Sequence, residues 1–99
     1  MKILALEIEV SGVRDEQFTL DLLVAESQRA WELYQEGTIR ELYFHRDNYE
    51  AVLILECENT DEAQRVLDTL PLVRENLIGF KILPLVPYDG FARLFQQEK

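Results

Sequence analysis

The stretch from Tyr34 to His45 changes its hydrophobic period at a single glycine, and this change constrains the fold more than any other feature of the sequence. Apolar residues recur at helical spacing before Gly37 and alternate as in a strand after it. Gly37 stands where a helix commonly ends on a glycine in the left-handed conformation. The alternation then places Glu41, Tyr43 and His45 on one face of the strand. A helix is therefore followed directly by a strand that carries three side chains able to share a proton.

The remaining segments supply three more strand patterns and one more helix. The predicted order is strand, helix, strand, strand, helix, strand, over residues 2–10, 17–36, 39–46, 49–58, 59–70 and 77–86. The short Asp47-Asn48 link makes the second and third strands an antiparallel hairpin. Asn59 is a typical first capping residue for the second helix. Pro84 and Pro87 stop the last strand, which predicts an edge position or a frayed end.

This order predicts an α+β domain of the ferredoxin-like βαββαβ type, with a four-stranded antiparallel sheet and two helices on one face. We assign residues 1–87 to this domain and residues 88–99, first aromatic and then polar, to a C-terminal arm. The opposite sheet face still carries apolar residues, and an exposed apolar face is normally covered by a partner. A second copy would cover it most simply, by pairing as a dimeric α/β barrel.

The first strand decides which polar residues reach the open face. Its wholly apolar side carries Leu4, Leu6 and Ile8, so we expect that side to face the helices. The open face would then hold Ile3 and Ala5, together with a polar set made of Glu7, Glu9, Glu41, Tyr43, His45 and Glu56. A partly enclosed carboxylate has a raised pKa and can serve as an acid or base near neutrality.

Charge and composition exclude several classes of function. The net charge of -9 argues against nucleic acid and against anionic membrane surfaces, which both attract clustered Lys and Arg. No apolar run approaches the ~20 residues needed to cross a bilayer, and the first residues lack a signal-peptide layout. Cys57 is the only cysteine, so an internal disulfide is excluded, and we expect a buried strand residue. There is no metal-ligand spacing, and the expected location is the cytoplasm.

Several of these residues have simpler interpretations that the sequence leaves open. Glu7 can be a solvated surface residue, and His45 can be an exposed residue at the edge of a loop. Arg40 can form an ion pair with a neighbouring acid or orient the carboxylate of a ligand. Trp31 lies on the helical stripe, where a core position is expected more often than a stacking platform for a ligand.

A set of short motifs points to a known family. It comprises Glu36-Gly37-Thr38, Arg40, Leu42, Tyr49, Glu56 and Leu70-Pro71-Leu72. In order and spacing these residues resemble the muconolactone delta-isomerase family of the dimeric α/β-barrel superfamily, over roughly residues 34–87. The resemblance implies a homodimer or larger homo-oligomer and a cofactor-independent shift of a proton and a double bond in a small lactone. Glu41 and Tyr43 stand where the family motif has a histidine and a tryptophan.

These observations lead to one expected function and two alternatives. We expect an isomerase-like protein that moves a proton on a small organic molecule without a cofactor or metal. Its catalytic candidates are Glu41, Tyr43, His45 and Glu56, and its substrate-binding candidates are Arg40 and Glu7. The first alternative is a non-catalytic oligomeric binding or scaffold module. The second is a cofactor-independent monooxygenase, because the same barrel architecture can host that chemistry.

Overall fold

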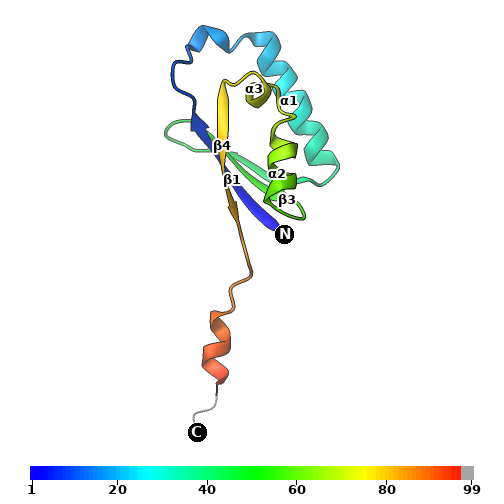
Figure 1. The fold of residues 1–99 in the computed structure, drawn as a ribbon, viewed down its shortest axis with the longest axis vertical. Coiled ribbons are helices and arrows are strands. Elements are labelled where there is room, and N and C mark those ends of the chain that lie inside the picture. The colour runs from blue at the N-terminus through cyan, green and yellow to red at the C-terminus, as the bar shows by residue number, and fades with distance from the viewer. Residues whose placement is uncertain (97–99) are drawn as a thin grey trace.

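A computed structural model of the chain describes residues 1–96 and shows the expected α+β fold, from which a C-terminal segment extends (Figure 1). The last residues of the predicted arm, 97–99, lie outside the described residues. The elements are β1 (Lys2–Glu9), η1 (Asp15–Gln17), α1 (Leu20–Gln35), β2 (Ile39–Phe44), β3 (Ala51–Glu56), α2 (Thr60–Leu67), α3 (Pro71–Arg74), β4 (Ile78–Pro84) and η2 (Gly90–Phe95). No helix in this part of the chain is both long and apolar enough to span a membrane.

The sheet has the strand order β2-β3-β1-β4, and all its pairs are antiparallel. The helices lie on one side of it, as the ribbon in Figure 1 shows. This arrangement confirms the predicted ferredoxin-like fold. It also confirms the edge position of β4 and the β2–β3 hairpin. Gly37 has a φ of 86°, which confirms the left-handed turn between α1 and β2.

The predicted orientation of β1 is wrong. Ile3 and Ala5 are completely buried under the helices, whereas Ile8 is 47% exposed. Ile3 pairs with Leu55, and Ala5 pairs with Leu53. Paired residues of antiparallel strands share a face, so β1 follows the buried side of β3 rather than its own more apolar side.

The corrected orientation moves one candidate residue to the other side of the sheet. Glu7 follows Ile3 and Ala5 at period two, so it lies on the side that faces the helices. Its partner on β4 is Phe80, which packs against the core. The expectation that Glu7 shares the open face with Glu41 is therefore wrong.

Helix α1 carries two apolar stripes rather than one. Thr19 caps it by accepting a hydrogen bond from the Leu22 amide at 3.3 Å. The stripe that packs on the sheet contains Leu22, Ala30 and the buried Leu33. A second stripe is exposed and contains Leu20, Leu23, Val24, Trp31 and Tyr34. Trp31 is 53% exposed, so the core position expected for it is wrong.

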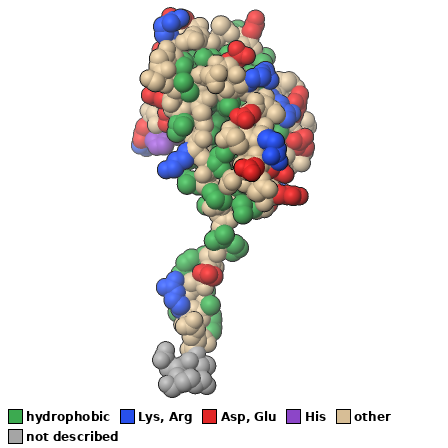
Figure 2. Space-filling view, in the orientation of Figure 1, with side chains coloured by type: hydrophobic (Ala, Val, Ile, Leu, Met, Phe, Trp, Pro, Cys, Tyr) green, Lys and Arg blue, Asp and Glu red, His purple; other side chains and the backbone are tan. Residues whose placement is uncertain are grey.

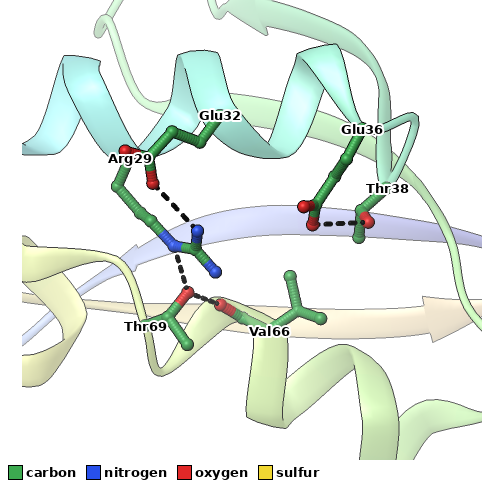
Figure 3. Close-up of polar contacts among 6 residues, drawn as sticks. All are labelled: Arg29, Glu32, Glu36, Thr38, Val66 and Thr69. Carbon is green, nitrogen blue, oxygen red and sulfur yellow. Dashed lines mark hydrogen bonds and ion pairs between the residues drawn. The ribbon is translucent and has the colours of Figure 1, made fainter.

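Helix α2 is capped by a side chain, and a hydrogen bond joins α1 to the segment between α2 and α3. Asn59 caps α2 by accepting from the Glu62 amide at 2.8 Å, as predicted. Arg29 of α1 donates to the Thr69 hydroxyl, between α2 and α3, at 2.9 Å (Figure 3). The same arginine pairs with Glu32 at 3.0 Å. These bonds fix the middle of α1 relative to the segment that leads into α3.

The C-terminal arm projects away from the domain (Figures 1 and 2). It leaves β4 beside β1, where the Leu85 amide donates to the Lys2 carbonyl at 2.9 Å. Its aromatic rings pack on each other, with Tyr88 and Phe91 centroids 5.0 Å apart. Most of its apolar side chains are nevertheless exposed, and they appear as hydrophobic surface along the arm in Figure 2.

Leucine-to-alanine substitutions on the two stripes of α1 should lower the free energy of unfolding by different amounts. Leu33→Ala should lower the free energy of unfolding by about 2–5 kcal/mol, because it leaves a cavity in the core. Leu20→Ala should change it by less than about 0.5 kcal/mol, because that side chain is largely exposed. Urea unfolding of both variants measures the difference. Equal losses would contradict the assignment of the packed face.

Candidate functional site

A pocket of about 910 Å³ lies between α1 and the helix-facing side of the sheet. Its aromatic lining residues are Phe18, Trp31, Tyr34, Tyr43, Phe44, Tyr49 and Phe80. Aliphatic side chains from the sheet and from the α2–α3 segment complete the walls. The charged residues that line it, among those described, are Glu7 and Glu26. The pocket is thus an apolar space with two carboxylates.

Glu7 enters the pocket from the central strand. Its Oε1 accepts a hydrogen bond from the Ala51 amide at 2.7 Å, at the start of β3. Burial raises the pKa of the Glu7 carboxyl above 4.5, and the charges of Glu50 and Glu9 add to the increase. The bond from Ala51 opposes this rise but does not cancel it. Glu7 is therefore easier to protonate than an ordinary glutamate.

Glu26 enters from the opposite wall. Its Oε1 accepts from the Leu72 amide at 2.9 Å, in the short helix α3. Burial raises the pKa of Glu26, and the nearby Glu7 charge also raises it, while the Leu72 bond and Arg74 lower it. The charge of an ionised Glu7 therefore makes Glu26 easier to protonate.

The position of Glu26 follows from the packed stripe of α1. Leu22, Glu26, Ala30 and Leu33 recur at spacings of four, four and three residues, which places them on one helix face. Glu26 is absent from the predicted site residues, because the exposed stripe of α1 is the more apolar of the two and was expected to face the core. A single carboxylate that interrupts a helical apolar stripe is the signal that could have found it.

Tyr43 also lines the pocket, and it is linked to Glu41. The Tyr43 hydroxyl donates to Glu41 Oε1 at 2.6 Å. This hydrogen bond to a carboxylate raises the pKa of Tyr43, because it stabilises the protonated hydroxyl. The structure therefore brings these two predicted residues together at the exposed edge strand β2.

Arg40 and Glu56 are each engaged outside the pocket. Arg40 lies at the bulge between Ile39 and Glu41, and its Nε donates to the Gly37 carbonyl at 2.6 Å. Glu56 pairs with the Met1 amine at 2.6 Å. The bond from this amine lowers the pKa of Glu56. Neither residue is among those that line the pocket.

His45 lies in the exposed turn between β2 and β3. Its Nδ1 accepts from the Asp47 amide at 3.1 Å. His45 is next to the start of β3, whereas Glu56 ends that strand, so about 17 Å of extended chain separates them. The structure thus places Glu7 and Tyr43 in the pocket, and it brings His45 near Glu7 only in the lining of a second, smaller pocket of about 240 Å³.

The rim of the pocket is aromatic and includes one unusual backbone conformation. Phe44 and Tyr49 have ring centroids 5.7 Å apart, and Trp31 and Tyr34 have centroids 6.1 Å apart. Tyr49 has a φ of 56°, a left-handed conformation that is rare for a bulky residue. That turn directs its ring to the wall of the pocket.

The fold and the pocket define a ferredoxin-like α+β domain with an apolar cavity between its sheet and its first helix. The family model of muconolactone delta-isomerase matches residues 4–89. The chain belongs to the muconolactone delta-isomerase family, as the motifs in its sequence indicated.

Solved structures agree with this assignment at the level of the fold. A muconolactone isomerase has a TM-score of 0.70 at 18% identity, over 90% of this chain and 92% of that chain. A 5-chloro-2-hydroxyhydroquinone dehydrochlorinase from Burkholderia phenoliruptrix AC1100, in complex with 2,5-dihydroxybenzoquinone, has a TM-score of 0.68 at 17% identity. That match covers 91% of this chain and 98% of the dehydrochlorinase. A search of curated proteins finds no match.

The raised pKa of Glu26 predicts a pH dependence of stability. Above pH 4.5 the folded protein retains a proton that the unfolded chain releases. The free energy of unfolding should therefore fall as the pH rises from 4.5 through the folded-state pKa. Glu26→Gln should remove this contribution to the pH dependence. The free energy of unfolding of the variant should therefore increase relative to that of the wild type as the pH rises towards neutrality.

Urea unfolding at a series of pH values measures the difference. Glu58→Gln is the matched control, because it removes the same charge from an exposed position that lies outside the pocket lining and does not shift the pKa of Glu7 or Glu26. A difference between Glu26→Gln and wild type that does not change with pH would contradict the assignment.

Proposed function

We propose that the protein is a cofactor-independent, isomerase-like enzyme that transfers a proton on a small organic molecule bound in the pocket. The observation that carries the proposal is the pair Glu7 and Glu26, two carboxylates with raised pKa on opposite walls of an apolar space. Membership of the muconolactone delta-isomerase family supports the same reaction class.

In this proposal the two carboxylates have complementary roles. One oxygen of each accepts a backbone amide, from Ala51 or from Leu72, and this bond fixes the orientation of the carboxylate. The described residues provide no hydrogen bond to the second oxygen of either group. The ionised member removes a proton from a carbon next to a carbonyl, and the protonated member returns one at another carbon. The double bond shifts between the two positions, and atoms and charge balance without a cofactor.

Each carboxylate should be needed for turnover but not for folding. Glu7→Gln and Glu26→Gln should each lower kcat/KM by about 10²–10⁴-fold, the usual contribution of a general acid or base. The assay is NMR detection of solvent deuterium entering a panel of unsaturated lactones and hydroxyquinones in D₂O. Glu58→Gln, which removes a carboxylate outside the pocket lining, should retain wild-type exchange. Full activity in both pocket variants would refute the proposed roles.

We also propose that the protein assembles as a homodimer or a larger homo-oligomer. The sheet face opposite the helices carries Leu4, Leu6, Val52 and Ile54, which are only partly buried. The exposed stripe of α1 and the apolar arm add further uncovered surface. The arm points away from its own domain, which favours packing on a neighbouring copy. These surfaces also suit the non-catalytic scaffold that remains the alternative function.

Sedimentation velocity at micromolar concentration should give a mass at least twice 11.6 kDa. Val52→Asp should reduce that mass, because it buries a charge between the two sheets. Gln64→Glu, which adds a charge of the same sign on the exposed side of α2, should leave the mass unchanged. A monomeric wild-type protein would contradict the proposed assembly.

A further inference from the structure

The pocket offers no positive charge to a ligand. Among the described residues that line it there is no Lys, Arg or His. Arg29, one turn after Glu26 on α1, is occupied by Thr69 and Glu32 at the contact with the α2–α3 segment (Figure 3). Arg40, which the sequence suggested as the partner of an acidic substrate, bonds to the Gly37 carbonyl.

Two more basic residues lie near the pocket but outside its lining. Arg74 is exposed on α3. Its charge lowers the pKa of Glu26, but this effect is smaller than those of burial, of the Leu72 hydrogen bond and of the Glu7 charge. Lys81 pairs with Leu6, which places it on the opposite face of the sheet. Neither provides a counter-charge inside the apolar space.

An anionic ligand in the pocket would therefore be repelled by the carboxylates, and no positive charge in the lining would offset this repulsion. It would lie between Glu7 and Glu26, with Glu50 and Glu9 close enough to raise the pKa of Glu7. The partial burial of both pocket carboxylates lowers the effective dielectric constant and strengthens such repulsion. The net charge of -9 for the whole chain adds in the same direction.

A neutral ring compound matches the remaining features. Aromatic and aliphatic walls stabilise an apolar ring system, and about 910 Å³ is ample for one or two fused rings. The second oxygens of Glu7 and Glu26 can accept a hydrogen bond from a hydroxyl, or donate one to a carbonyl when protonated. Both carboxylates lie on walls that are mostly apolar, so hydrogen bonds to them would orient the ring.

We propose that the pocket selects uncharged, largely apolar ring compounds that carry carbonyl or hydroxyl groups, and rejects the corresponding carboxylates. This inference rests on the proposed function, because it names the substrate class of the same site. Glu7 and Glu26 are the source of this selectivity. They therefore determine which ligand binds, in addition to transferring its proton.

Matched pairs of probes that differ only in charge test the selectivity. The pairs are methyl naphthylacetate with naphthylacetate, and methyl cyclohexylacetate with cyclohexylacetate. NMR titration of the indole N–H of Trp31 reports binding locally, because this tryptophan lines the pocket and is the only one in the chain. Each ester should bind the full-length protein at least about tenfold more tightly than its acid at neutral pH.

The Glu7→Gln/Glu26→Gln double variant should reduce the ratio of ester to acid affinity several-fold, whereas Glu58→Gln, at an exposed position outside the pocket lining, should preserve it. Equal or tighter binding of the acids to wild type would overturn the inference. So would an unchanged ratio in the double variant, or the absence of any Trp31 shift with the esters. Binding and deuterium exchange are measured on different compounds, so an absence of exchange by the wild-type protein, with the selectivity preserved, would refute the proposed proton transfer alone.

Discussion

The pairing of β1 with β3 is the constraint on which the rest of the structure depends. With Ala5 opposite Leu53, the small side chain lies under the helices and allows them to approach the sheet closely. The same register places Glu7 two residues further along on that side, inside the pocket. A shift of one residue would reverse every side chain of β1 and send Glu7 to the open face. One long-range pairing therefore determines both the core and one of the two pocket carboxylates.

Local signals in the sequence were sufficient to predict the four strands, α1 and α2, and their order, but not the short helices η1, α3 and η2. The glycine turn at Gly37, the cap at Asn59 and the hairpin turn at Asp47-Asn48 depend on the neighbouring backbone alone, and the structure contains all three. The orientation of β1 depends instead on contacts with distant strands. Both its sides begin with apolar residues, so alternation by itself does not distinguish the buried side.

The candidate site was less predictable for the same reason. Glu26 appears in the sequence as an ordinary helical carboxylate, and its burial depends on α3, whose Leu72 amide lies 46 residues away along the chain. Tyr43 and Glu7 were predicted as site residues, but on one shared face. The structure brings both to the pocket from different faces, because β2 is an edge strand and the pocket opens beside it. Sequence patterns indicated which types of residue the site contains, whereas tertiary packing determines which of these residues lie close together.

The exposed stripe of α1 has a thermodynamic consequence. Leu23, Trp31 and Tyr34 belong both to the pocket lining and to the outer surface of the helix. A subunit that covers this stripe would therefore bury the outer rim of the binding space. Ligand affinity and subunit association would then be linked, and each would strengthen the other by the same factor. Dilution of such an assembly would weaken ligand binding without any change in the residues that contact the ligand.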